Sequence, residues 1–336
     1  MSERPPDPAP IMALTVAYWG AQALLTANRI GVFDVCSGTG LPLTAVAARL
    51  GTAPRPTELL LKSLAGLGLL EARDGAYRNT RLADFYLVSK SPAFMGNALR
   101  YSDNLYSTWG ELEKALREDR PPLAAESYLG ADRKTTRDFV HGMHQRAMAA
   151  GRALVEIVDL AGRTRMLDVG GGPGTYASLF AKKYAQLSVQ LLELPGVAEI
   201  AKEIVADMGC ADRVTVLAGS YDDTPFPGGN DVVLISGVLH RESAAGCRAL
   251  IAKAAASLVP GGLLVVSDVF TDDGGATPVF AALFGVNMML TAPNGGVHSD
   301  ADVARWLGEA GLGDIAVRPF PPPMPHRVVM GTKIRS

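Results

Sequence analysis

Four glycines lie within seven residues in the stretch Asp168-Val-Gly-Gly-Gly-Pro-Gly174, which follows a short apolar run and precedes a segment with helical spacing. Glycine has no Cβ and readily adopts positive φ, so such a loop lets a ligand approach the backbone closely. The helix that follows presents its amino end to a polar group, and Asp168 adds a carboxylate. We expect a nucleoside-like ligand here, although Gly172, Gly174 and Ala177 also fit the loose dinucleotide fingerprint.

The ends of the following predicted strands carry side chains that suit the rest of such a ligand. Glu193 closes one strand, where its carboxylate can accept hydrogen bonds from both hydroxyls of a ribose. Open α/β sheets bind their ligands at the carboxyl ends of the strands, so these side chains are expected to meet. The predicted cofactor-binding residues are Asp168, Gly170, Gly172, Glu193, Ser220, Tyr221 and Ser236.

His240 follows the fourth predicted strand and precedes a helix that Ser243 can cap. A histidine at this edge can take a proton from a hydroxyl group, because imidazole titrates near neutral pH. Asp268 ends the neighbouring strand, where it would orient the imidazole and stabilise its cation. A helix cap or a loop ion pair is an equally good interpretation of Asp268.

The elements that must position these residues begin after Arg165, where short apolar runs alternate with helical segments. This rhythm is typical of a mostly parallel sheet with helices on both faces. The predicted strands span residues 165–169, 188–193, 213–218, 231–236, 262–269, 313–319 and 326–333. The last connection is too short for a parallel crossover, so the last strand is predicted to be antiparallel. The fold class is α/β, with a Rossmann-like seven-stranded, mostly parallel sheet.

The amino-terminal part has a different pattern, which predicts helix, turn, helix and hairpin. One helix is expected from Leu43, capped by Thr44 and closed by Gly51, and a second at 57–67 after a turn at 54–56. The Asp-Gly pair at 74–75 lies between two extended runs and predicts a tight hairpin. This is a winged-helix pattern. Because the second helix offers one lysine among leucines, we expect dimerisation rather than DNA binding.

The composition fits an enzyme that acts on small molecules in the cytoplasm. A net charge of −2 does not favour binding to nucleic acid or to an anionic membrane surface, because such partners attract a positively charged protein. Cys36, Cys210 and Cys247 show no metal-ligand spacing, so they are expected to stay reduced, and no metal is expected. Residues 1–10 are expected to form a disordered leader. No uncharged apolar run is judged long enough to span a membrane.

The loop at 167–174 resembles motif I of the class I S-adenosylmethionine-dependent methyltransferases. Nearly all of residues 11–334 is similar to one branch of them, the two-domain small-molecule O-methyltransferases, which include caffeate, acetylserotonin and antibiotic-tailoring enzymes. The other motifs that carry the resemblance are Ile30-Gly-Val-Phe-Asp34, Leu67-Gly-Leu-Leu70, Val238-Leu-His240, Leu258-Val-Pro-Gly-Gly262 and Met288-Met-Leu290 through Gly295-Gly296.

The resemblance implies that S-adenosylmethionine is the cofactor and S-adenosylhomocysteine the product. It implies methyl transfer to an oxygen of a small acceptor, which we expect to be a phenolic or polyketide-like secondary metabolite. It also implies a homodimer formed through the amino-terminal domain. In this interpretation His240 is the general base.

Further site residues follow from the same resemblance. Met143 and Phe139 would line the methyl-transfer site, where a soft thioether packs well near a sulfonium, although ordinary helix core is the alternative for Met143. Asn287 and Asn294 would border the acceptor pocket.

Three positions depart from the family pattern. Arg241 stands where the family usually has Asp after the histidine, and Ser220 replaces the usual Asp beside adenine. His298 stands where an acid often follows the paired glycines, and it is kept among the catalytic candidates. If His298 faces His240, Asp268 is the remaining partner of the imidazole.

The expected organisation is a leader at 1–10, a winged-helix dimerisation domain at 11–90, a helical substrate-lining linker at 91–160 and a catalytic domain at 161–336. Three other functions stay open. One is an NAD-dependent oxidoreductase, against which the position of Asp168 argues. The others are a methyltransferase fold used for C- or N-methylation or a non-methylating reaction, and a winged-helix regulator that senses S-adenosylmethionine.

Overall fold

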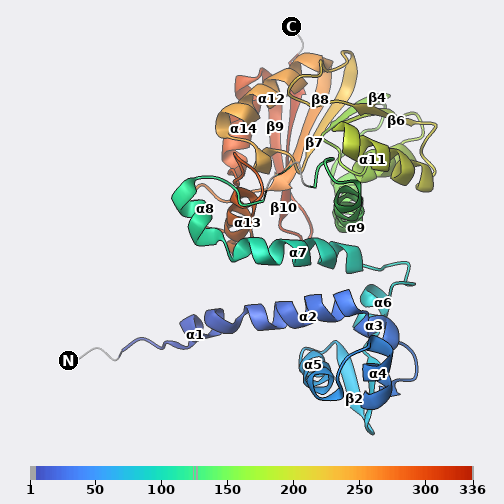
Figure 1. The fold of residues 1–336 in the computed structure, drawn as a ribbon. Coiled ribbons are helices and arrows are strands. Elements are labelled where there is room, and N and C mark those ends of the chain that lie inside the picture. The colour runs from blue at the N-terminus through green and yellow to red at the C-terminus, as the bar shows by residue number, and fades with distance from the viewer. Residues whose placement is uncertain (1–4, 124, 126–127, 335–336) are drawn as a thin grey trace. The chain divides into compact units, whose positions relative to one another are not determined.

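The computed structural model describes residues 5–123, 125 and 128–334. The chain divides into two compact units, Met1–Leu105 and Tyr106–Ser336, and Figure 1 shows the elements of each.

The first unit is mainly helical and contains a small antiparallel sheet. Its helices are α1 (Ala9–Val16), α2 (Tyr18–Ile30), α3 (Val32–Val35), α4 (Leu43–Leu50), α5 (Pro54–Gly66) and α6 (Arg81–Leu87), and α7 (Gly96–Trp109) begins in it. Its strands are β1 (Leu41–Pro42), β2 (Leu70–Arg73) and β3 (Ala76–Asn79), in the order β1-β3-β2. Phe33, Leu61 and Leu64 are fully buried among its core residues. The predicted winged-helix order is confirmed.

Two helix starts in this unit differ from the prediction, whereas the hairpin agrees with it. Helix α4 has Pro42 at its N-cap and no side-chain cap, so the expected cap by Thr44 is wrong. Helix α5 begins at Pro54 rather than at residue 57, because proline at the first helical position has its φ already set for a helix. Asp74 and Gly75 both have positive φ, at 51° and 76°, as a tight hairpin turn requires.

Helices α1 and α2 follow each other from Ala9 to Ile30 and are largely exposed. The last two residues of the expected leader are therefore helical, and residues 1–4 lie outside the described part of the chain. The stretch is 22 residues long and contains an 18-residue window with a mean hydropathy of 1.2, enough to cross a membrane by length and composition. This corrects the expectation that no apolar run has that length. One such stretch near the N-terminus is weak evidence for a membrane span.

The second unit contains a seven-stranded sheet. Its strands are β4 (Arg165–Val169), β5 (Ser188–Glu193), β6 (Val214–Ala218), β7 (Asn230–Ser236), β8 (Leu258–Val269), β9 (Leu312–Pro319) and β10 (His326–Lys333). Their order is β6-β5-β4-β7-β8-β10-β9. The pairings among β4 to β8 are parallel, and β10 is antiparallel to both β8 and β9, as predicted.

Successive residues of each central strand enter opposite cores. In β4, Met166 belongs to the core cluster that includes α9–α11 residues, whereas Leu167 and Val169 belong to the cluster with α12 and α14. Figure 1 shows α9 and α11 on one side of the sheet and α12 and α14 on the other. Because both faces of the sheet are buried, the sequences of the central strands are nearly continuous runs of apolar residues. It also leaves the carboxyl ends of the strands as the edge at which polar residues collect.

Helices connect these strands and cover their faces. They are α8 (Leu112–Glu118), α9 (Arg133–Ile157), α10 (Thr175–Lys183), α11 (Pro195–Asp207), the short 3-10 helix η2 (Leu239–Arg241), α12 (Ala244–Ser257), α13 (Val279–Met289) and α14 (Asp300–Glu309). Helix α9 begins at Arg133, where the Asp132 side chain accepts a hydrogen bond from the Thr135 N–H and caps the helix. The three cysteines are free and buried.

Candidate active site

The glycine loop turns the chain from β4 into α10 through residues with positive φ. Gly170, Gly172 and Gly174 have φ of 63°, 55° and 73°. A Cβ on Gly171 would lie 2.5 Å from Asp168 Oδ2, so the turn is too tight for a side chain there. A Cβ on Gly172 would have no neighbour within 4 Å among the described residues. The backbone of Gly172 therefore borders open space, as close approach of a ligand requires.

Asp168 is an unpaired carboxylate beneath this loop. It is fully buried, and neither oxygen has a hydrogen-bond partner among the described residues. Burial and the charge of Glu193 raise the pKa of the Asp168 carboxyl to about 7, although the nearby N–H of Ala177 opposes the shift. A buried polar group without a partner is costly, so this site has the character of one completed by a polar or cationic ligand.

Glu193 ends β5 and is tied directly to the loop. Its Oε2 accepts the Gly172 N–H at 2.8 Å, and its Oε1 accepts the Leu194 N–H at 2.7 Å. Burial raises the pKa of the Glu193 carboxyl, while these two hydrogen bonds and the charge of Arg241 act against the rise. Each oxygen keeps a further acceptor position, so the carboxylate can still take hydrogen bonds from two hydroxyls.

The other predicted cofactor residues lie at neighbouring strand ends. Ser220 Oγ accepts the Asp222 N–H at 3.1 Å, and the Tyr221 hydroxyl donates to Glu242 Oε1 at 2.6 Å. Ser236, the last residue of β7, shares a hydrogen bond with the hydroxyl of Tyr176.

Tyr176 itself was not predicted from the sequence. Burial raises the pKa of its hydroxyl to about 12, and the charges of Asp168 and Asp268 act in the same direction. Tyr176 therefore lies within electrostatic reach of both carboxylates. Its position directly after the glycine loop was the only signal in the sequence.

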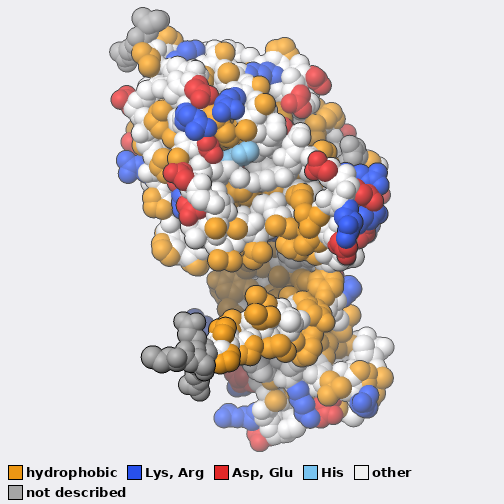
Figure 2. Space-filling model, turned by 90° about the vertical axis from the view of Figure 1, so that its left-hand side faces the viewer, with side chains coloured by type: hydrophobic (Ala, Val, Ile, Leu, Met, Phe, Trp, Pro, Cys, Tyr) orange, Lys and Arg blue, Asp and Glu red, His pale blue; other side chains and the backbone are white. Residues whose placement is uncertain are grey.

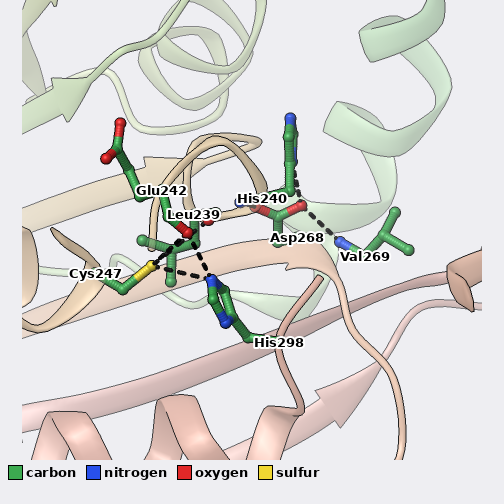
Figure 3. Close-up of polar contacts among 7 residues, drawn as sticks. All are labelled: Leu239, His240, Glu242, Cys247, Asp268, Val269 and His298. Carbon is green, nitrogen blue, oxygen red and sulfur yellow. Dashed lines mark hydrogen bonds and ion pairs between the residues drawn. The ribbon is translucent and has the colours of Figure 1, made fainter. Parts of the chain in front are cut away.

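His240, in the middle of η2, meets Asp268, the last residue but one of β8. His240 Nδ1 lies 2.7 Å from Asp268 Oδ1, which also accepts the Val269 N–H at 2.8 Å (Figure 3). Burial would raise the pKa of the Asp268 carboxyl, but the charge of His240 and the hydrogen bond from it lower that pKa below its ordinary value. Ser243 caps α12 by accepting the Gly246 N–H at 3.2 Å, as expected. The pair leaves the second ring nitrogen of His240 pointing away from the carboxylate (Figure 3).

His298 belongs to a different set of contacts. Its Nε2 lies 2.9 Å from the carbonyl oxygen of Glu242 and 3.3 Å from Cys247 Sγ, on the side away from the His240 imidazole (Figure 3). Its ring packs edge-on against Trp306, with centroids 5.1 Å apart. Asp268, not His298, is thus the side chain at the His240 ring nitrogen. His298 instead stabilises the turn after His240 through its contact with the Glu242 carbonyl oxygen.

The predicted acceptor residues are spread over several elements. Phe139 and Met143 lie one turn apart on α9 and are half-buried. The Asn287 amide oxygen on α13 accepts the Trp109 indole N–H at 2.9 Å, and Asn294 is exposed in the following loop.

An aromatic wall beside the imidazole adds residues that were not named from the sequence. Phe284 packs edge-on against the His240 ring with centroids 5.0 Å apart, and Phe280 stacks on Phe284 at 6.1 Å and 10°. The signal was their spacing of four residues, which places both on one face of a helix.

Two family models together match most of the chain. The family model of the O-methyltransferase domain matches residues 109–313, and that of the O-methyltransferase dimerisation domain matches residues 12–89.

Two similar relatives come from Streptomyces. The 3-hydroxy-5-methyl-1-naphthoate 3-O-methyltransferase of Streptomyces sahachiroi is 31% identical over 330 residues, covering 97% of this chain and 95% of the relative. The tetracenomycin polyketide synthesis 8-O-methyl transferase TcmO of Streptomyces glaucescens is 31% identical over 314 residues, with 92% of each covered.

Among solved structures, an O-methyltransferase family protein from Burkholderia thailandensis matches with a TM-score of 0.90 at 26% identity, covering 98% of this chain and 99% of that one. The match extends over both units. The chain therefore belongs to the two-domain O-methyltransferase family and is an S-adenosylmethionine-dependent methyltransferase.

Proposed function

We propose that this enzyme methylates a phenolic hydroxyl on a flat, polyketide-like aromatic metabolite, with His240 as the general base. The observation that carries the proposal is the His240–Asp268 contact of 2.7 Å, which lies at the same sheet edge as the glycine loop. The aromatic faces of Phe280 and Phe284 beside the imidazole suit a planar acceptor. The names of the two Streptomyces relatives support the same class, since one is a hydroxynaphthoate O-methyltransferase and the other an O-methyl transferase of tetracenomycin polyketide synthesis.

The residues at the sheet edge fit S-adenosylmethionine. Glu193 would accept the ribose hydroxyls, and the bare backbone at Gly172 would allow the ligand to lie against the loop. Asp168 would balance positive charge on the cofactor, which would supply the missing partner of its buried oxygens. Ser220, Tyr221 and Ser236 would border the adenosine end. When bound, this cofactor supplies an electrophilic methyl group on a sulfonium.

The chain's own part in the reaction is positioning and proton transfer. Asp268 accepts the Nδ1–H of His240, which leaves a lone pair on Nε2 directed away from the carboxylate. His240 Nε2 would remove the proton from the acceptor hydroxyl as the oxygen takes the methyl group, whose bond to sulfur would break with its electron pair left on S-adenosylhomocysteine. The resulting imidazolium is stabilised by the Asp268 carboxylate, and the proton leaves to solvent after product release. Met143, Phe139, Asn287 and Asn294 are proposed to border the acceptor.

An acceptor screen tests the reaction class. We expect label from methyl-labelled S-adenosylmethionine to appear on oxygen when hydroxynaphthoic acids or hydroxylated anthraquinones are supplied. The corresponding methyl ethers, which have no free hydroxyl, are the matched controls and should gain no label. Mass spectrometry and carbon NMR of the product locate the methyl group. Label on a ring carbon or a nitrogen would contradict the proposal.

We also propose a role for each of three segments of the chain. Residues 11–90 form the dimerisation domain, residues 91–160 line the acceptor site, and residues 161–336 bind the cofactor. Large apolar side chains are exposed on α1 and α2, among them Ile11 at 68%, Leu14 at 76% and Trp19 at 61%. Figure 2 shows hydrophobic side chains gathered on this face of the first unit. A second copy of the chain in the cytoplasm would cover them. Light scattering should give twice the chain mass of 35.3 kDa, and a monomer mass would refute the dimer.

A further inference from the structure

A side-chain contact ties helix α9 to the segment that leaves the glycine loop. His144 Nδ1, on α9, lies 2.8 Å from Thr175 Oγ1. Thr175 is the first residue of α10, directly after Gly174, and it is fully buried. Among the described residues, the imidazole is the only hydrogen-bond partner of this hydroxyl. Burial lowers the pKa of the His144 imidazole, so the contact joins two uncharged groups near neutral pH.

The glycine loop itself offers few groups by which it could be held in place. Four of the seven residues at 168–174 are glycines, which have no side chain to form a hydrogen bond. Glu193 Oε2 accepts the Gly172 N–H at 2.8 Å and fixes the middle of the loop. Thr175 is the first residue after the loop whose side chain can form a hydrogen bond. Because glycine loses much conformational freedom when it is ordered, such a loop depends on fixed contacts around it.

The His144 contact lies at the loop end of a longer interface between α9 and α10. Further along α9, a Cβ on Gly151 would lie 2.6 Å from Leu179 Cδ1, so the two helices are closely packed there. At the far end of α10, Lys183 Nζ donates to the carbonyl oxygen of Val155 at 2.7 Å. The packing and the second hydrogen bond hold the helices together away from the loop. His144 is the residue that acts where α10 meets the loop.

We propose that His144 is a positioning residue for the cofactor, which holds the start of α10 and the adjoining glycine loop in the shape that the cofactor binds. The inference rests on the proposed cofactor site at Gly172 and Glu193. Without the imidazole, the buried Thr175 hydroxyl would have no partner unless the start of α10 moved. Movement there would displace the loop. Apparent affinity then falls in proportion to the fraction of molecules that keep the binding shape.

His144→Phe keeps a ring at this position and removes its nitrogens. We expect the Kd for S-adenosylhomocysteine, measured by calorimetry, and the KM for S-adenosylmethionine to rise about ten-fold. We expect kcat at saturating cofactor to change less than about three-fold, because His240 and Asp268 are untouched. His144→Asn should recover most of the affinity. Its amide places an oxygen or a nitrogen near the position of Nδ1 and can therefore pair with the Thr175 hydroxyl as acceptor or donor.

Thr175→Val removes the hydroxyl and keeps the shape of the side chain. The double variant with His144→Phe should bind S-adenosylhomocysteine more tightly than His144→Phe alone, because it leaves no buried hydroxyl without a partner.

Lys183→Met is the matched control, since it removes the other hydrogen bond between α9 and α10 at the end away from the loop. We expect it to lower the melting temperature and to leave the Kd for S-adenosylhomocysteine unchanged.

Two results would overturn the inference. One is a folded His144→Phe enzyme whose Kd for S-adenosylhomocysteine stays within two-fold of wild type. The other is a rise in Kd of the same size in Lys183→Met, which would assign the effect to the general packing of α9 on α10. Gly172→Ala separates these failures from failure of the proposed function. If Gly172→Ala weakens cofactor binding and His144→Phe does not, only the inference fails. If neither does, the proposed cofactor site is wrong.

Discussion

The His240→Ala enzyme is expected to bind S-adenosylhomocysteine as tightly as the wild type and to turn over roughly 10²- to 10⁴-fold more slowly. The imidazole contacts Asp268 and Phe284, whereas the glycine loop and Glu193 are held by their own hydrogen bonds. Removal of the ring therefore takes away the proton acceptor and leaves the cofactor contacts in place. Initial rates at saturating cofactor and acceptor, with calorimetry on the same preparation, measure the two effects separately.

His141→Ala is the matched control for this substitution. His141 lies on α9, where the charged groups that act on it are Arg137, Glu203, Asp207 and Asp138, none of which belongs to the proposed site. Its loss should leave turnover within two-fold of wild type. Turnover in His240→Ala that equals the His141→Ala value, with the true acceptor, would remove the base assignment.

Asp268→Asn tests whether the carboxylate orients the ring. The substituted amide can present a donor to His240 Nδ1, which favours the tautomer that carries its proton on Nε2 and so blocks proton removal from the acceptor. We expect kcat to fall with little change in cofactor affinity. An unchanged kcat would contradict the orienting role.

The sheet could be predicted closely because its central strands are buried on both faces and bounded by polar turns. The strand predicted at 188–193 and that at 165–169 have the observed bounds. The strand predicted at 262–269 begins four residues earlier, at Leu258, because Leu258-Val-Pro-Gly-Gly continues the pairing with β7 despite its turn-like composition. Local composition does not show that a neighbouring strand is available. Element ends of this kind depend on the tertiary structure.

The site could be predicted to the level of strand ends, not of side-chain partners. Asp168, Glu193 and Asp268 were found because each closes an apolar run at the edge where such sheets bind ligands. The direction of His298 depends on Cys247 and on the Glu242 carbonyl, residues more than 50 positions away in sequence. Likewise, the Tyr128 hydroxyl meets a carbonyl 163 residues later. No spacing rule in one sequence can supply such long-range contacts.

Substitution of Gly172 by alanine is expected to abolish useful cofactor binding while leaving the fold nearly intact. The added Cβ would meet no atom of the part of the chain that the structure describes within 4 Å, so the cost to folding is limited to the strain of a φ of +55°, on the order of 1 kcal/mol. The same Cβ would occupy the space through which the cofactor approaches the loop backbone. We expect affinity for S-adenosylhomocysteine to fall by more than about ten-fold, as measured by calorimetry.

Gly209→Ala isolates the steric effect from the backbone strain. Gly209 has a φ of +66° and, like Gly172, no described neighbour within 4 Å of the position that a Cβ would take, but it follows α11 at the opposite edge of the sheet. Both variants should lose a similar amount of thermal stability, because each forces alanine into the left-handed region. Only Gly172→Ala should lose cofactor affinity. Equal affinities in the two variants would mean that the cofactor does not lie against the backbone of the glycine loop.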